Sequence, residues 1–168
     1  MKLYLAGPMT RIPQFNFPEF RAVTLILRDL GFEVVSPAES DAPAVQIAAW
    51  DSPDGDPAAL PAETGGSDPF GTAMKNMDDI WGVDAIALLA GTKTSAGTQH
   101  ELATALRWDK PSAPWWVWAA AQDSLSHSLP YWRSMADDLH QCSEGVADGY
   151  TGPGGLGLLT EWARGGAA

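Results

Sequence analysis

Short apolar runs that alternate with helical patterns restrict the fold of this chain most strongly. Lys2–Ala6 and Phe32–Val35 have the composition of short buried strands, and the segment between them repeats its apolar residues at spacings of three and four. A second helical pattern over Thr72–Trp81 leads into another apolar run, Ala85–Leu89. Strands that alternate with helices in this way pair in parallel through right-handed crossovers. The sequence therefore predicts an α/β protein.

We expect a small doubly wound parallel sheet, Rossmann-like or flavodoxin-like, of about four to five strands with helices on both faces. The tryptophan-rich run Trp115–Trp118 is predicted to be a fourth strand under a final helix; alternatively, its rings form a subunit interface or a wall that stacks on a base. Ala119–His140 is predicted to be helical, with an interruption near Pro130. Asn16 is predicted to cap the first helix, which has Pro18 in its first turn.

Two segments break the alternation of strands and helices. Ala38–Gly71 is rich in Asp, Pro, Ala and Gly, which predicts a loop-rich insertion that is either a lid or a mobile segment near the site. Ile47 and Trp50 are the apolar side chains that could fix part of it. Glycine dominates much of the C-terminal part, so residues 141–168 are predicted to be an irregular extension with a short helix over Leu158–Arg164.

Length, charge and cysteine content exclude several classes of partner and site. The 168 residues fit a single domain, 1–168, and the formal net charge of −11 argues against a nucleic-acid polymer as partner. Cys142 is the only cysteine, and the three histidines lack a metal-ligand spacing, so we expect no metal and no cofactor. No signal peptide or membrane-spanning run is visible, which predicts a cytoplasmic protein without membrane contact.

The segment from Ser95 to Leu102 has the composition of a binding loop. It follows the predicted strand Ala85–Leu89 and opens a helical pattern, so the first N–H groups of the helix point beyond the strand end, where the helix dipole favours an anion. Small and hydroxyl-bearing residues let a ligand approach the backbone there. Glu101 is expected in the first helical turn, facing the same cleft; alternatively, it only complements the helix dipole.

Three stretches together resemble a known superfamily. They are Tyr4-Leu5-Ala6-Gly7-Pro8-Met9-Thr10, Gln14-Phe15-Asn16-Phe17-Pro18, and Ser95-Ala96-Gly97-Thr98 leading to Glu101. They resemble the nucleoside 2-deoxyribosyltransferase-like superfamily, and within it a small uncharacterised branch, DUF4406-like, that is frequent in bacteriophage genomes. The resemblance covers residues 1–37 and 72 to about 114.

The resemblance implies an activity and a set of site residues. Glu101 would be the nucleophile that attacks the anomeric carbon of a deoxyribose, expels the base and forms a glycosyl ester, which water or a second base resolves. Ser95 would bind a 5′-phosphate, and Arg11, where the branch more often has glycine, suits a phosphate as well. The full set of expected substrate-binding residues is Tyr4, Gly7, Met9, Thr10, Arg11, Ser95, Gly97 and Thr98.

One position departs from the superfamily pattern. The superfamily places an aspartate, the proton donor to the leaving base, where this chain has Asn76. An amide cannot act as an acid, and general acid help is worth about 10²–10⁴-fold; Asp78 is the second choice for that role. Two functions therefore remain open: an N-glycosidase or deoxyribosyltransferase acting on a deoxynucleoside or its monophosphate, and a nucleotide-binding module with impaired catalysis. The resemblance also implies a homo-oligomer.

Overall fold

A computed structural model of the chain describes residues 1–61, 69–123 and 128–145. Its four strands are β1 (Lys2–Ala6), β2 (Glu33–Val35), β3 (Ala85–Leu88) and β4 (Ser112–Pro114). They form one parallel sheet in the order β2-β1-β3-β4. The prediction of an α/β fold with a parallel sheet is confirmed, and the strand order is that of a flavodoxin-like, doubly wound protein.

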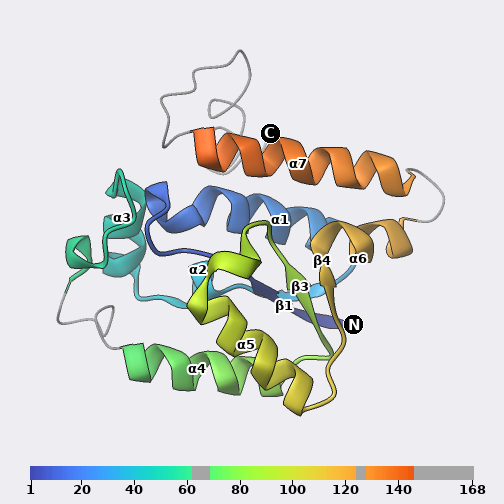
Figure 1. The fold of residues 1–168 in the computed structure, drawn as a ribbon, viewed down its shortest axis with the longest axis horizontal. Coiled ribbons are helices and arrows are strands. Elements are labelled where there is room, and N and C mark those ends of the chain that lie inside the picture. The colour runs from blue at the N-terminus through green and yellow to red at the C-terminus, as the bar shows by residue number, and fades with distance from the viewer. Residues whose placement is uncertain (62–68, 124–127, 146–168) are drawn as a thin grey trace.

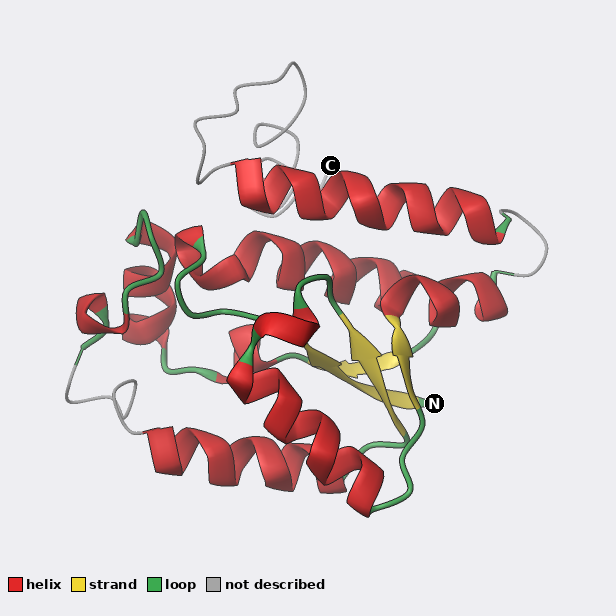
Figure 2. Ribbon diagram, viewed as in Figure 1, coloured by secondary structure: helices red, strands yellow, loops and turns green. Residues whose placement is uncertain are grey.

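Helices cover both faces of the sheet (Figures 1 and 2). Leu3 and Leu5 of β1 point to the face covered by α1 (Phe17–Asp29) and α6 (Trp115–Gln122), where they join a large apolar core. Alternate residues of a strand point to opposite faces. Tyr4 therefore points to the other face, where it packs with residues of α4 (Pro69–Trp81) and α5 (Ala96–Arg107).

The last described helix, α7 (Leu129–Gly145), forms an additional layer. Figure 1 shows it lying across α1 and α6, on the side that faces away from the sheet. Trp132 of α7 meets Trp115 of α6 edge to face, with ring centroids 6.2 Å apart, and both rings are buried. Such pairs are worth about 0.5–1.5 kcal/mol beyond the area that they bury. The predicted interruption near Pro130 corresponds to the start of this helix, because Pro130 lies in its first turn.

The tryptophan-rich run is a helix, so the predicted strand over Trp115–Trp118 is wrong. The fourth strand comes just before it and is only three residues long, Ser112–Pro114. Pro114 ends the strand and stands at the N-cap of α6, where its fixed φ and missing N–H are tolerated. The tryptophans then anchor α6: Trp115 is buried, and Trp118 donates its indole N–H to the carbonyl oxygen of Ile86 at 3.0 Å.

The predicted insertion contains helices between residues 38 and 61, so the expectation of a loop-rich segment is wrong for this part. It contains α2 (Pro37–Ser40), α3 (Pro43–Asp51) and the 3-10 helix η2 (Pro57–Ala59), all of which begin with proline. Trp50 meets Phe17 edge to face at 6.1 Å, as expected for a residue that fixes the segment. Ile47, by contrast, is 65% exposed.

Several predictions fall outside the described residues. Residues 62–68 of the insertion and the whole stretch 146–168, including the predicted helix over Leu158–Arg164, are among them. In the parts of the chain that the structure does describe, no helix is both long and apolar enough to cross a membrane.

Candidate functional site

The order of the strands creates a switch point between β1 and β3. The chain leaves β1 toward β2 on one side and then crosses to β3 on the other, so the loops after β1 and β3 diverge. In open α/β sheets, ligands bind in the crevice that this divergence opens beyond the carboxyl ends of the strands. The backbone N–H of Leu89 donates to the carbonyl oxygen of Ala6 at 2.9 Å, which holds the two strand ends together.

The loop after β1 packs directly against the end of β3. A Cβ atom on Gly7 would lie only 2.8 Å from Cβ of Leu89, which is buried. Only glycine therefore permits this approach of the two backbones. The contact fixes the loop that carries Met9, Thr10 and Arg11 over the sheet edge.

A left-handed turn follows this loop in the 3-10 segment η1 (Pro13–Asn16). Gln14, Phe15 and Asn16 all have φ between 51° and 60°, a conformation that costs L-residues about 1–2 kcal/mol each. The residue after α3 supports it, because the N–H of Gln14 donates to the carbonyl oxygen of Ser52 at 2.8 Å. Backbone strain of this kind persists only where the surroundings impose it, and it clusters at functional sites.

Asn16 stands at the N-cap position of α1, as predicted, but its side chain makes no capping hydrogen bond to the helix. Instead, Nδ2 donates to the carbonyl oxygen of Pro8 at 3.1 Å and to Oε2 of Glu19 at 3.0 Å. The left-handed backbone at Asn16 turns the amide inward, so the side chain ties the β1 loop to the first turn of α1.

The loop after β3 ends in the N-terminus of α5. Ser95 is the N-cap: its Oγ accepts from the N–H of Thr98 at 3.3 Å and from Oγ1 of Thr98 at 3.0 Å. Because the helix begins at Ala96, Glu101 lies in its second turn, and the prediction of a first-turn position is wrong. In the second turn, the carboxylate of Glu101 lies further from the helix N-terminus than expected and reaches the side chain of Tyr4.

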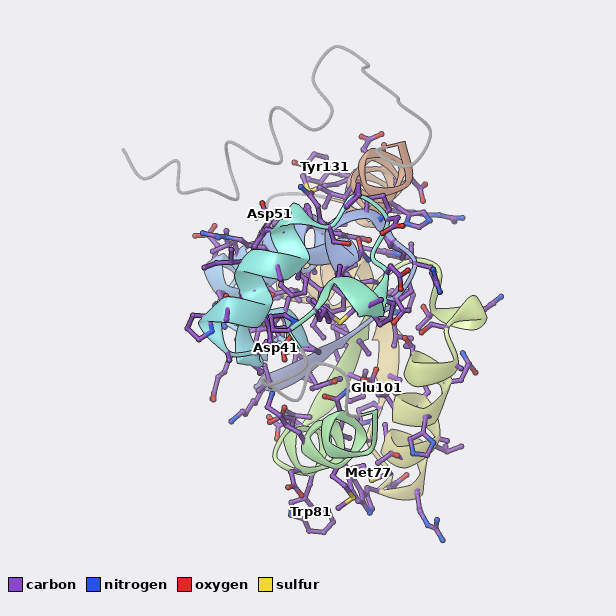
Figure 3. All side chains as sticks on the ribbon, turned by 90° about the vertical axis from the view of Figure 1, so that its left-hand side faces the viewer. Asp41, Asp51, Met77, Trp81, Glu101 and Tyr131 are labelled. Atoms are coloured by element: carbon purple, nitrogen blue, oxygen red, sulfur yellow. The ribbon has the colours of Figure 1, made fainter. Side chains whose placement is uncertain are left out.

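Two donors hold one oxygen of Glu101. The phenolic O–H of Tyr4 and Nδ2 of Asn76 each donate to Oε1 at 2.8 Å. Among the residues that the structure describes, no hydrogen bond ends on Oε2, so this oxygen is available to a ligand. In Figure 3, Glu101 lies inside the molecule near the sheet, whereas Trp81 lies at the outer edge of α4.

Burial controls the protonation of this carboxyl group. Loss of solvation raises the pKa of Glu101 from 4.5 to about 7, and the hydrogen bonds from Tyr4 and Asn76 lower it only in part. Burial, followed by the neighbouring Glu101, raises the pKa of Tyr4 well above its usual value. Tyr4 thus stays a neutral donor, while Glu101 changes its charge near neutral pH. Perturbed groups in a cleft mark candidate functional sites.

A cavity of about 700 Å³ opens beside these groups. Its size lies within the range of about 300–1,000 Å³ that is typical for small-molecule sites. The lining residues come from the β1 loop, α4, the β3 loop, α5 and α7. They are Gly7, Pro8, Met9, Thr10, Arg11, Ile12, Asn76, Gly91, Ser95, Ala96, Gly97, Thr98, Glu101 and His140.

Most of the residues singled out from the sequence thus lie together. Tyr4 is fully buried beneath the cavity and reaches it through Glu101. Arg11 lies at the rim, with 71% of its side chain exposed, and its guanidinium is 3.4 Å from the carboxylate of Asp56. Asp78 is not brought to the site: it is exposed on α4 and does not line the cavity.

Sequence reasoning missed five lining residues, Pro8, Ile12, Gly91, Ala96 and His140. Pro8, Ile12 and Gly91 belong to the two loops already singled out. His140 belongs to α7, far along the chain, and no local pattern marks it. In the described part of the chain, no group of three or more His, Cys, Asp or Glu side chains is arranged to hold a metal ion.

Fold and cavity together define an α/β protein with a cavity at the switch point of a parallel sheet. The chain belongs to the family described as a domain of unknown function (DUF4406), whose model matches residues 1–111. The match ends just before β4 and therefore includes every lining residue except His140. Comparisons with curated proteins and with solved structures found no match.

Proposed function

We propose that this protein cleaves the N-glycosidic bond of a deoxynucleoside or a deoxynucleoside 5′-monophosphate, as an N-glycosidase or a 2-deoxyribosyltransferase. The observation that carries the proposal is Glu101 itself, a largely buried carboxyl group at a switch-point cavity, with one oxygen held by two donors. The proposal also assigns the chain to the nucleoside 2-deoxyribosyltransferase-like superfamily and, within it, to a phage-associated branch.

The arrangement of donors suits a nucleophile. Tyr4 and Asn76 fix Oε1 and leave Oε2 to attack the anomeric carbon of the sugar. The glycosidic bond breaks, the base leaves, and a glycosyl ester remains on Glu101 until water or a second base takes the sugar. Because burial disfavours the free carboxylate, forming a neutral ester there is favoured relative to the same step in water.

The rest of the cavity suits a nucleotide. The N-terminus of α5 presents backbone N–H groups that favour an anion, with the hydroxyls of Ser95 and Thr98 beside them. A 5′-phosphate would bind there. The acidic chain, with a net charge of −11, supports a small ligand rather than a nucleic-acid polymer. Such metabolites occur in the cytoplasm, where we propose that the protein acts, with no cofactor.

A nucleotide-binding module with impaired catalysis is the second candidate. Asn76 favours it, because an amide beside Glu101 cannot protonate a leaving base. The pKa of about 7 also keeps part of Glu101 protonated, and hence not nucleophilic, at neutral pH.

The two candidates separate in one experiment. The protein is incubated with a panel of deoxynucleosides and their monophosphates, free base is measured by chromatography, and ligand binding is followed by melting temperature. The enzyme proposal predicts base release by the wild type and by Glu33→Ala, a control that removes an exposed glutamate, but not by Glu101→Ala. Melting shifts without base release would support the binding module and contradict the enzyme.

We also propose a homo-oligomer, through the outer face of α4 and α5. Trp81 is 66% exposed and Leu106 is 79% exposed, and the ring of Trp81 meets that of Trp108 at 5.0 Å. The expected contact through Trp115–Trp118 is weaker as a proposal, because Trp115 is buried inside the protein. Light scattering should report an oligomer for the wild type and a smaller species for Trp81→Glu; a monomeric wild type would contradict the proposal.

A further inference from the structure

One wall of the cavity comes from outside the family match. His140 lies on α7, whereas the match ends at residue 111, and yet His140 lines the same cavity as Glu101. The two side chains approach from opposite faces of the sheet. Glu101 comes from α5, on the face of Tyr4, and α7 covers the layer over α1 and α6 on the other face.

A buried carboxylate lies next to His140. Nδ1 of the imidazole is 3.9 Å from Oε2 of Glu19, which is within ion-pair range but longer than a hydrogen bond. The side chain of Glu19 is 1% exposed, and the same oxygen accepts from Asn16. Glu19 lies in the first turn of α1, where the helix dipole favours a negative charge. The contact joins the imidazole to the loop that Asn16 ties to α1.

The position of Glu19 also orients the ring. Nδ1 is the ring nitrogen that lies near Oε2 of Glu19. Cε1, the atom between the two nitrogens, would be 3.9 Å from a Cβ atom on Gly91, which itself lines the cavity. The ring of His140 therefore lies between Glu19 and a residue of the cavity wall. A carboxylate that sets the orientation and protonation of a histidine is a recurrent device in acid–base catalysis.

Few cavity-lining groups can give a proton to a departing base. Asn76 is an amide, and Arg11 is a guanidinium that does not lose its proton in proteins. The hydroxyls of Thr10, Ser95 and Thr98 are very weak acids. Glu101 must itself be ionised to attack the sugar. His140 remains, and histidine is the residue type that most often transfers protons in catalysis.

We propose that His140, oriented by Glu19, is the proton donor to the leaving base. The inference rests on the proposed function, and it takes the acid and the nucleophile from two different walls of the same cavity, where they can flank the scissile bond. If His140 supplies the proton, position 76, which lies within the family match, does not need an acidic residue. In this chain α7 brings the acid instead.

The step balances in atoms and electrons. A lone pair on Oε2 of Glu101 forms the bond to the anomeric carbon while the carbon–nitrogen bond breaks and its electron pair passes to the base. The base takes a proton from the protonated imidazole of His140 and leaves neutral, and His140 becomes a neutral imidazole. In the second step His140 accepts a proton from the attacking water, the oxygen–carbon bond to Glu101 breaks, and both groups return to their starting states.

The test compares two leaving groups. The first substrate is the deoxynucleoside or monophosphate that the panel identifies, whose base needs a proton. The second carries a 4-nitrophenyl group on the same sugar. Its leaving group, 4-nitrophenolate, is a stable anion that needs no proton. For His140→Ala we expect a loss of about 10²-fold or more in kcat with the natural substrate and a near wild-type rate with the nitrophenyl substrate. His140→Gln should behave alike, and Glu19→Gln should show a smaller loss with the same selectivity.

His100→Ala is the matched control, since His100 is exposed on α5 and does not line the cavity. Turnover of the nitrophenyl substrate also reports that each variant is folded. An equal loss on both substrates would overturn the proposal, because His140 would then act in binding only. Full activity of His140→Ala on the natural substrate would also overturn the proposal. A wild type that cleaves only the nitrophenyl substrate would overturn it as well. Neither result would contradict the role of Glu101. A wild type that cleaves neither substrate would overturn the proposed function and this inference with it.

Discussion

Replacing Glu101 with glutamine should stabilise the protein above neutral pH. The substitution keeps the shape of the side chain and an oxygen that can accept from Tyr4 and Asn76, and it removes the buried charge. In the wild type the pKa rises from 4.5 in the unfolded chain to about 7 in the folded protein. At about 1.4 kcal/mol per pKa unit, this difference corresponds to about 3 kcal/mol as an upper limit.

The sign follows from proton linkage. Between pH 4.5 and about 7 the folded state holds a proton on Glu101 that the unfolded chain has lost. The stabilisation linked to that proton is complete below pH 4.5 and is lost as the pH rises through about 7. The variant has no such dependence. We therefore expect wild type and Glu101→Gln to unfold at similar temperatures near pH 4.5 and to differ most at pH 8.

Thermal unfolding by circular dichroism measures the difference. A domain of this size changes its melting temperature by about 2–4 °C per kcal/mol, so Glu101→Gln should melt up to about 6–12 °C above the wild type at pH 8. Glu33→Gln, which alters an exposed glutamate, controls for the general effect of removing an acidic charge. A variant that is no more stable than the wild type at pH 8, or a gap that does not change with pH, would refute the assignment of a buried, protonated carboxyl group.

Three further variants test the site. Tyr4→Phe removes a hydrogen bond that lowers the pKa of Glu101, so the pH at which activity appears should move upward; an unchanged pH–rate profile would count against the contact. Asn76→Asp places a second carboxyl group 2.8 Å from Glu101. Two carboxyl groups this close share a proton, so the pH–rate profile should move upward as well. A gain of turnover in an otherwise inactive protein would instead favour the binding module. Gly7→Ala brings a Cβ atom to 2.8 Å from Leu89 and should cost about 1–3 kcal/mol in chemical denaturation; an unchanged midpoint would contradict the close packing of the two strand ends.

Much of the fold follows from local sequence patterns. The first three strands appear as short apolar runs bounded by breakers, and α1 and α4 appear as amphipathic periods. The error at Trp115–Trp118 has a simple cause: four consecutive large or branched apolar residues suit a buried strand as well as a buried helix. Packing on Trp132, far along the chain, favours the helix, and no local pattern contains that information.

The site divides in the same way. The loops after β1 and β3 could be found because each follows directly on a strand, and the topology of a parallel sheet brings such loops together. Glu101 could be found because the helix that carries it begins at the end of the second loop. The depth of Glu101 could not be found, because it depends on where α5 begins and on the side chain of Tyr4. The histidine at position 140 is beyond local reasoning altogether, since it joins the cavity only through the packing of α7.

A covalent intermediate tests the central claim most directly. The wild type is mixed with the substrate that the panel identifies, quenched in acid within the first turnovers, digested and analysed by peptide mass spectrometry. We expect a deoxyribosyl adduct, with or without its phosphate, on the peptide that contains Glu101, and none in Glu101→Ala. Base release together with an adduct on another residue, or an adduct that persists in Glu101→Ala, would contradict the assignment of Glu101 as the nucleophile.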